Sequence, residues 1–325
     1  MKILLVSSSK LNNKYPQRSY YLFKTIKNMG IDIIGIESFN PIIGIFSIIK
    51  NINVKYRIFS GFRAGIAGLF LSFLGFKWIY DLVEVKYKLC NDNWKGFKRI
   101  FIPLIDILEK LMIKRADIVF VAGKSVFKYA KKIRNDIILI PNGYDSSLFN
   151  PNKYNRELLR KEYEVNFPLA IYIGKLTPMY AKFLINAIKA MEIVAKEFPN
   201  SEFWIFGNGP SRNFLEKISN KNVKFKGYIE HEKVPEILII ADLGIHAYDT
   251  ESLKLLEWLV MGLPIIAPKG IDYEEIVECE WEPEKIAKEV IKIFKNPHRK
   301  PRKILSWEDI CKIILKVIEK LKNAK

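Results

Sequence analysis

The chain has 325 residues, of which 49% are hydrophobic and 27% are charged. This composition excludes a disordered chain, and the length favours two domains over one. The formal net charge is +18, and residues 1–150 hold 24 of the 53 Lys and Arg but only 10 of the 35 Asp and Glu. A basic first half suggests a polyanionic partner, namely nucleic acid, anionic lipid headgroups or a phosphorylated acceptor.

Cysteines and terminal signals narrow the class further. Cys90, Cys279 and Cys311 are widely separated and odd in number, so they predict neither a disulfide framework nor a zinc site. The N-terminal MKILLVSSS lacks the long apolar core of a signal peptide, which favours a cytoplasmic protein. The chain has no helix-turn-helix, ribonucleoprotein or zinc-finger signature, so we expect no nucleic acid partner.

The first half alternates buried strands with helices. Residues 2–6 predict a strand, and a loop then leads into a helix over residues 20–29 that Gly30 ends. Further strands are expected at residues 31–36, 56–59, 77–82, 116–122 and from 137, and further helices at 64–76 and 102–115. The helix at 64–76 is shorter than the ~17 to 25 residues that span a bilayer, so we expect it in a core. Residues 41–49 are too short and Gly-interrupted to assign.

The second half repeats this alternation, which is typical of doubly wound α/β domains. Strands are expected at residues 168–173, 201–206, 223–227, 243–247 and 265–267, and helices at 212–218, 231–240, 253–261 and 306–321. Ser306 is expected to cap the last of these helices. The carboxylates of residues 277–284 lack a histidine and a clear strand, so they indicate a solvated acidic loop rather than a metal site.

Residues 241–268, ADLGIHAYDTESLKLLEWLVMGLPIIAP, predict a strand, a polar turn and a helix. Ser252 precedes the helix and is expected to cap it by accepting a backbone N–H. The helix start would still present free amides and a positive dipole end, where a phosphate could bind. Glu257, on the second turn, could accept hydrogen bonds from ribose hydroxyls. The same string also suits a purely structural buried helix between two parallel strands, so spacing alone leaves both readings open.

The segment LKLLEWLVMGLPIIAP resembles "KLLEYLAMGLPVVA" of the family 4 retaining glycosyltransferases, also called glycosyl transferases group 1. Seven more segments resemble family motifs in the family's order: KWIYDL, ADIVFVA, IPNGYD, IGKL, FGNGP, VKFKGYI and the closing SWEDI. The resemblance implies the GT-B fold, in which two Rossmann-like domains face each other across a cleft. It implies an acceptor domain at 1–147, a nucleotide-sugar donor domain at 148–303, and a C-terminal helix, 304–325, that packs back on the first domain.

The resemblance also implies site residues. Lys175 would pair with the donor diphosphate, and Lys182 is the nearest match to the family's second basic residue. Other residues implied to bind the nucleotide sugar are Gly174, Gly207, Gly209, Tyr228, Ile229, Ser252, Leu253 and Lys254. Asn142 and Gly143 would form a hinge, although both also suit a tight turn.

The family pattern of two glutamates separated by seven residues places its second member at Glu257. Counting back from Glu257 reaches Asp249, with Glu251 close by, and either carboxylate could contact the sugar or lie in a surface loop. The implied catalytic set is therefore Lys175, Glu257, Asp249 and Glu251. The chain has no Asp-x-Asp motif, so we expect neither a metal ion nor another cofactor.

Two departures from the family pattern leave other functions open. Arg18 and Ser19 stand where the family has a Gly-Gly pair, and we expect that Arg18 could bind an anionic acceptor group. Val83 and Glu84 stand where the family often has a histidine, so no acceptor-side base is named. The alternatives are a non-catalytic nucleotide-sugar-binding subunit, a sugar-nucleotide epimerase, or an inverting transferase on the same fold.

The implied reaction transfers a sugar from a UDP-, GDP- or ADP-sugar to a hydroxyl acceptor with retention at the anomeric carbon, as in cell-surface polysaccharide, glycolipid or glycan synthesis. The basic first half and the apolar segments 42–49 and 64–76 suggest a lipid-linked or anionic acceptor. Four lysines, Lys124, Lys128, Lys131 and Lys132, are expected to cluster on one helix. These features predict a cytoplasmic protein that binds peripherally to the anionic inner face of a membrane, and solvated lysines are the alternative explanation.

Overall fold

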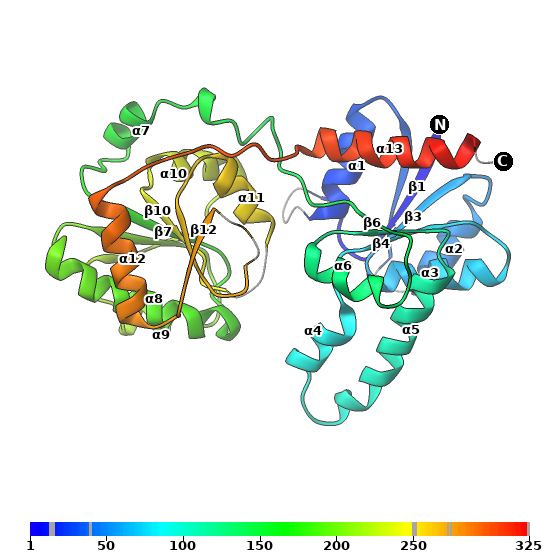
Figure 1. Ribbon diagram of the computed structural model, residues 1–325, viewed down its shortest axis with the longest axis horizontal. Helices are drawn as coiled ribbons and strands as arrows, with labels where there is room; N and C mark the ends of the chain where they lie inside the picture. The colour runs from blue at the N-terminus through cyan, green and yellow to red at the C-terminus, as the bar shows by residue number, and fades with distance from the viewer. Residues whose placement is uncertain (13–16, 39–40, 249–251, 272, 274, 324–325) are drawn as a thin grey trace. The chain divides into compact units, whose positions relative to one another are not determined.

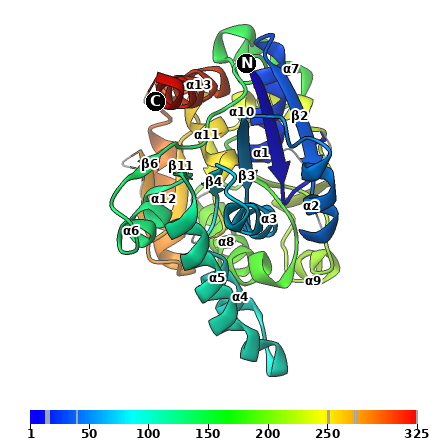
Figure 2. The same ribbon diagram turned by 90° about the vertical axis from the view of Figure 1, so that its right-hand side faces the viewer.

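The computed structural model describes residues 1–12, 17–38, 41–248, 252–271, 273 and 275–323. The chain divides into two compact units: residues 1–143 with 305–325 form unit 1, and residues 144–304 form unit 2. In each unit, helices lie on both faces of one parallel sheet (Figure 1, Figure 2). Parallel strands need crossover connections, which explains why strands and helices alternate in the sequence.

Among the described residues, the sheet of unit 1 has six parallel strands in the order β2-β1-β3-β4-β5-β6. The strands are β1 (Lys2–Ser7), β2 (Asp32–Glu37), β3 (Tyr56–Ser60), β4 (Ile79–Leu82), β5 (Ile118–Val121) and β6 (Ile137–Leu139). The helices are α1 (Arg18–Asn28), α2 (Pro41–Ile49), α3 (Phe62–Phe73), α4 (Lys86–Asn93), α5 (Ile102–Arg115), α6 (Lys124–Lys131) and α13 (Trp307–Asn323), with a 3-10 helix η1 (Gly96–Phe101).

The strands predicted for this half are confirmed, with small differences at their ends. Residues 41–49, which the sequence left unassigned, form helix α2. The predicted core helix is α3, and its inner residues are buried beside Trp78 and Tyr80. Helix α4 and the 3-10 helix η1 were not predicted, because this stretch lacks a single clear apolar period.

The C-terminal helix α13 belongs to unit 1 and packs on α1. The rings of Tyr21 and Trp307 stack with centroids 5.1 Å apart and planes 10° apart. The predicted cap is confirmed, since Ser306 Oγ accepts from the amide of Asp309 at 3.1 Å. The amide of Ser306 in turn donates to Asp309 Oδ2 at 3.0 Å. This reciprocal capping box fixes where the last helix begins.

Among the described residues, the sheet of unit 2 also has six parallel strands, in the order β12-β11-β10-β7-β8-β9. The strands are β7 (Leu169–Ile173), β8 (Glu202–Phe206), β9 (Val223–Gly227), β10 (Leu243–Ile245), β11 (Ile265–Pro268) and β12 (Ile276–Cys279). The helices are α7 (Arg156–Glu162), α8 (Pro178–Glu197), α9 (Arg212–Lys217), α10 (Val234–Ile240), α11 (Leu253–Val260) and α12 (Pro283–Lys295), with 3-10 helices η2 (Pro151–Lys153) and η3 (His231–Lys233).

The prediction of a solvated acidic loop at residues 277–284 is wrong for its first part. Strand β12 pairs with β11 at the edge of the sheet, where Ile276 is buried and Glu278 is exposed. The strand was missed because an edge strand needs only one apolar face. The carboxylates in and beside β12, such as Glu275, Glu278 and Glu280, hid that short apolar pattern. Helices α8, α9 and α12 cover one face of this sheet, and α7, α10 and α11 cover the other (Figure 1).

Candidate functional site

Three loops at the carboxyl edge of the unit 2 sheet are hydrogen-bonded to one another. The amide of Gly174, after β7, donates to Phe206 O at 3.0 Å. The amide of Gly207, after β8, donates to Gly227 O of β9 at 2.6 Å. In the loop after β7, the amide of Leu176 donates to Asn208 O, in the loop after β8, at 3.1 Å. We call these loops, residues 174–176, 207–209 and 227–229, the glycine rim.

Glycine is needed at two positions of the rim because neighbouring backbones approach closely. A Cβ on Gly207 would lie 1.8 Å from Gly174 O, and the φ of Gly207 is +134°. A Cβ on Gly209 would lie 2.4 Å from Leu176 O. These glycines therefore let two loops pack together at the end of the sheet, which leaves their backbone groups close to any ligand bound there.

We predict that Gly207→Ala lowers the stability of unit 2 by about 2 to 3 kcal/mol, because the methyl group meets a carbonyl oxygen and the backbone conformation disfavours a side chain. Thermal unfolding followed by circular dichroism would measure this. Gly75→Ala is the control, since Gly75 also has a positive φ but a Cβ there would meet nothing within 4 Å. Equal losses in the two variants would show that loop packing at Gly207 does not matter.

The start of α11 lies beside the glycine rim, and its predicted cap is wrong in one respect. Ser252 occupies the N-cap position with an extended backbone, but its side chain caps no amide. Its Oγ is buried, and no hydrogen-bond partner for it is found among the described residues. The first amides of a helix have no partner within the helix, and none of the described residues accepts from the N–H groups of Leu253 and Lys254, so these groups are candidates to bind a ligand.

Lys254 is held at the end of β7. Its Nζ donates to Ile173 O at 2.9 Å and lies over the rings of Tyr172 and Trp258, 4.7 and 5.5 Å from their centroids. Burial lowers the pKa of Lys254 to about 7, and the charge of Glu257 only partly opposes this. The amino group therefore sits beside Gly174 and titrates near neutral pH.

Glu257 is buried on α11 and bound to a histidine. Its Oε1 lies 3.0 Å from His231 Nε2, and the His231 ring meets the Phe149 ring edge-on, with centroids 5.3 Å apart. Burial raises the pKa of Glu257 more than the hydrogen bond from His231 lowers it. Burial lowers the pKa of His231, but the hydrogen bond and charge of Glu257 outweigh it, so this pKa is raised. The pair thus favours holding one shared proton.

The sequence interpretation missed His231, which it placed only at the start of a helix. The residue begins η3, directly after the β9 loop. It is one of three histidines in the chain, and it follows GYIE at the carboxyl end of a predicted strand. That position was an available signal, because polar side chains after parallel strands gather at one edge of the sheet.

The two candidate phosphate-binding lysines have different surroundings. Lys175 is exposed at the rim, and its carbonyl accepts from Tyr172 Oη at 3.1 Å. Lys182 is exposed on α8, and its Nζ lies 4.7 Å from the centroid of the Phe183 ring. Phe183 also contacts Tyr248, which follows β10, with ring centroids 6.0 Å apart. Both lysines therefore lie toward the same edge of the sheet.

The structure says less about the remaining candidate site residues. Tyr228 is exposed in the rim, and Ile229 packs against the core under α10 and α11. Asp249 and Glu251 lie outside the described residues. No group of three or more His, Cys, Asp or Glu side chains placed to hold a metal ion occurs among the described residues.

Arg18 is not available to an acceptor, so that expectation is wrong. It is 2% exposed and forms an ion pair with Asp81, with Nε 3.0 Å from Oδ1. Its Nη1 donates to Pro141 O at 3.0 Å and to Asn142 Oδ1 at 3.1 Å. A Cβ on Gly143 would lie 2.8 Å from the backbone of Ser306. Asn142 and Gly143 therefore pack within unit 1, at the end of its first segment, and their role as a hinge remains a prediction.

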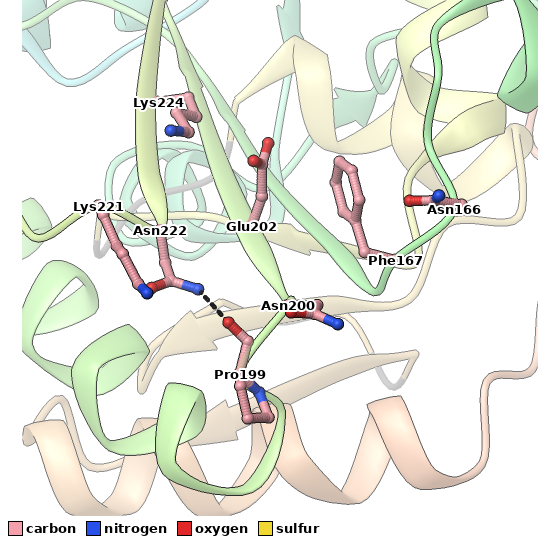
Figure 3. A pocket seen from close by; sticks show the side chains of 8 residues that line it. All are labelled: Asn166, Phe167, Pro199, Asn200, Glu202, Lys221, Asn222 and Lys224. Carbon is pink, nitrogen blue, oxygen red and sulfur yellow. Dashed lines mark hydrogen bonds between the residues drawn. The ribbon is translucent and has the colours of Figure 1, made fainter.

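A polar hollow on unit 2 lies at the opposite edge of the sheet from the rim. Its lining residues precede or begin β7, β8 and β9: Asn166, Phe167, Pro199, Asn200, Glu202, Lys221, Asn222 and Lys224 (Figure 3). Asn222 Nδ2 donates to Pro199 O at 2.9 Å and so ties two of these turns together. Ligands of open α/β sheets bind at the carboxyl ends of strands, so this hollow is not our candidate.

Comparisons with known proteins show what this chain is similar to. Residues 168–296 match the family model described as "Glycosyl transferases group 1". The chain is 22% identical over 197 residues to a component of the phosphatidylinositol N-acetylglucosaminyltransferase of Arabidopsis thaliana, covering 54% of this chain and 42% of that protein. It is 24% identical over 208 residues to alpha-monoglucosyldiacylglycerol synthase of Acholeplasma laidlawii, covering 57% and 51%. The chain thus spans about half the length of the curated relatives it matches.

Solved structures share the fold of the whole chain. Anabaena HepE in complex with UDP superposes with a TM-score of 0.71 at 14% identity, covering 99% of this chain and 100% of that one. Sucrose-phosphate synthase from Thermosynechococcus elongatus superposes with a TM-score of 0.69 at 14% identity, covering all of both chains. The two parallel sheets with their surrounding helices are therefore the GT-B fold that the sequence predicted.

Proposed function

We infer, from the membership of residues 168–296 in the glycosyl transferases group 1 family and from the GT-B fold, that this protein transfers a sugar from a nucleotide diphosphate sugar to a hydroxyl acceptor. We further propose that it does so with retention at the anomeric carbon and without a metal ion. One observation carries the proposal: the glycine rim, the uncapped start of α11 and the buried Glu257 meet at the carboxyl edge of the unit 2 sheet.

The chemistry of this edge suits a nucleoside diphosphate. The free amides at the start of α11 and the exposed Lys175 would bind the diphosphate and stabilise its negative charge as the sugar departs. Glu257, whose Oε1 is held by His231, would accept from the ribose hydroxyls. Backbone groups of Tyr228 and Ile229 would meet the base. Asp249 and Glu251 stay in the proposal as candidate contacts to the sugar.

A ligand panel tests the proposal. UDP-, GDP- and ADP-sugars are compared by thermal shift, since a ligand that binds the folded state stabilises it in proportion to the logarithm of its concentration over Kd. We expect one base to be preferred, and UDP is tested first because the similar HepE structure contains it. Transfer of a labelled sugar with retained stereochemistry supports the proposal. Binding without transfer or hydrolysis would indicate a non-catalytic binding protein. A product with inverted stereochemistry would indicate an inverting transferase, and an epimerised sugar would indicate an epimerase.

Lys175→Ala should weaken diphosphate binding about tenfold, because one charge-assisted hydrogen bond is lost from an exposed position. Calorimetric titration with the preferred nucleoside diphosphate measures this. The matched control is Lys285→Ala. Lys285 is also exposed, but it lies on α12, near the C-terminal end of unit 2. Unchanged affinity in Lys175→Ala would remove this lysine from the site.

The low pKa of Lys254 predicts a pH dependence of donor binding. Without ligand the amine loses its proton as pH rises through about 7. A bound diphosphate favours the ammonium form, so affinity should fall as pH rises above 7, and binding at pH 8 should take up close to one proton. Calorimetry in buffers of different ionisation enthalpy counts that proton. Lys254→Met should abolish the uptake; uptake that persists in this variant would assign it to another group.

The acceptor is proposed to be lipid-linked or anionic. The two relatives described above are named for phosphatidylinositol and for a glycosylated diacylglycerol, and the first half of this chain is strongly basic. The four lysines 124, 128, 131 and 132 are all exposed on or next to α6. No described helix is both long and apolar enough to cross a membrane. We therefore propose peripheral binding to an anionic membrane, and the free cysteines favour its reducing, cytoplasmic side.

A further inference from the structure

Residues 86–115 of unit 1 form a helical hairpin, made of α4, η1 and α5, that extends away from the sheet (Figure 1, Figure 2). One side of this hairpin carries large apolar side chains that are exposed to solvent. Their exposed fractions are 78% for Phe97, 77% for Ile100, 50% for Phe101, 52% for Leu104, 54% for Ile107 and 37% for Leu111. Soluble proteins seldom expose so many neighbouring apolar side chains without a partner.

The exposed side chains form one stripe rather than a scatter. Phe97 and Ile100 are three residues apart in the 3-10 helix η1, and Leu104, Ile107 and Leu111 are three or four apart in α5, so each set lies on one face of its own helix. Arg115 lies one turn beyond Leu111 on the same face, and its guanidinium lies 4.2 Å from the centroid of the Phe73 ring. The stripe therefore continues onto the end of α3, where Phe73 and Leu74 are also exposed.

The stripe is not the side by which helix α5 packs on unit 1. Helix α5 has a second apolar side, including Ile105, Met112 and Ile113, which is buried. Met112 and Ile113 belong to the core that covers the unit 1 sheet. Because that inner side already anchors the helix, the outer stripe is free to serve an interaction with another surface.

Charge identifies the kind of surface. Residues 86–115 contain eight Lys and Arg against three Asp and Glu. At the tip, Lys95, Lys98 and Arg99 are exposed beside Phe97 and Ile100. A stripe of apolar side chains flanked by basic ones matches the boundary between anionic headgroups and acyl chains, where the apolar groups enter and the cations meet lipid phosphates.

We propose that the hairpin of residues 86–115 docks this protein on an anionic lipid bilayer, with the stripe from Phe97 to Leu111 inserted at the headgroup boundary. Lys95, Lys98 and Arg99 bind lipid phosphates. The inference rests on the proposed function and deepens it, because it names the surface that would hold the enzyme beside a lipid-linked acceptor. It makes the hairpin the main contact with the membrane, in addition to the lysines of α6.

Vesicle flotation tests the docking surface. The full chain is mixed with vesicles of phosphatidylcholine alone or of phosphatidylcholine with phosphatidylglycerol, at low and high salt. We expect binding to the anionic vesicles that weakens with salt. Phe97→Ser with Ile100→Ser should abolish it, and Lys98→Gln with Arg99→Gln should lower the partition coefficient about 30-fold, since each basic residue contributes on the order of 1 kcal/mol.

Matched controls remove the same chemistry from unit 2. Leu158→Ser with Phe214→Ser removes two exposed apolar side chains, and Lys285→Gln with Lys288→Gln removes two exposed charges. Both controls should bind anionic vesicles as the unchanged protein does. Wild-type vesicle binding by the hairpin variants would overturn the proposal, as would failure of the unchanged protein to bind either vesicle.

The hairpin proposal and the proposed function can fail separately. Thermal shift by the preferred nucleotide sugar is measured on the same variants, and we expect it to be unchanged in all of them. Hairpin-dependent flotation without any nucleotide binding would leave the docking surface standing while refuting the transferase. Loss of stripe-dependent self-association, rather than of vesicle binding, would identify a second copy of the chain as the partner and so overturn the lipid proposal.

Discussion

Replacement of Arg18 with alanine should lower the free energy of unfolding of unit 1 by about 3 to 5 kcal/mol, because it leaves the buried carboxylate of Asp81 without its counter-charge. Asp81 is completely buried, and its Oδ2 also accepts from the hydroxyl of Ser60 at 2.7 Å. Arg18 also supplies the hydrogen bonds that hold Pro141 and Asn142. We therefore expect the region where the chain leaves unit 1 to loosen together with α1.

Urea unfolding measures this loss, and hydrogen exchange would show that it falls on unit 1. Lys2→Ala is the control, since Lys2 forms an exposed ion pair with Asp32 in the same unit, where we expect a change within about 0.5 kcal/mol. A second variant, Arg18→Met with Asp81→Leu, removes both charges and should recover much of the stability. If Arg18→Ala alone were as stable as the control, the buried pair would not hold this region.

Glu257→Gln should reduce kcat/KM for transfer about 100-fold or more, while the fold is retained. The amide keeps the shape of the side chain, but it accepts hydrogen bonds less strongly and donates where the carboxylate accepted. Both the contact with His231 and the proposed contacts with the ribose depend on those acceptor oxygens. Steady-state kinetics with the preferred donor gives the effect, and Glu284→Gln on α12 controls for loss of one surface charge.

His231 offers a readout of Glu257 that does not depend on activity. The hydrogen bond and charge of Glu257 raise the pKa of His231 against the effect of burial, so this pKa should fall in Glu257→Gln. An NMR titration of the His231 ring measures it. A large fall in melting temperature combined with full activity in the surviving protein would show that Glu257 is structural; an unchanged pKa of His231 would contradict the pairing.

The sequence predicted the strands of both units except β12, and it missed several helices, among them α4, α8 and α12. Strands such as β1 and β7 are continuous apolar runs, so their period and length identify them as buried parallel strands. Strand β12 and helix α4 escaped because their residues are only partly buried, and partial burial leaves a weak pattern. The exposed stripe on α5 was not predicted either. A helix with two apolar sides does not reveal from its sequence which side is buried.

In the candidate site too, local features could be predicted from the sequence and long-range pairings could not. Residues 174 and 207 could be predicted because a glycine directly after a buried strand has a local reason, and the loops indeed pack at the carboxyl edge of the sheet. The pairing of Glu257 with His231 joins positions 26 residues apart, which no local pattern reveals. The roles assigned to all these residues in binding a nucleotide sugar, including those of Lys175, Glu257 and the rim glycines, remain predictions, as do the contacts of Asp249 and Glu251.

The sequence by itself determined the doubly wound fold, the family resemblance of the second half and the cap at Ser306, because each depends on residues close together in the chain. Only the tertiary structure decided which charged side chains are buried, since burial depends on segments that meet after folding. Arg18 illustrates the difference: its sequence position suggested an anion-binding residue, but Asp81, 63 residues away, takes up its guanidinium. Ser252 shows the reverse, because the sequence predicted a capping bond that its side chain does not form. Its buried hydroxyl lies instead at the proposed diphosphate site.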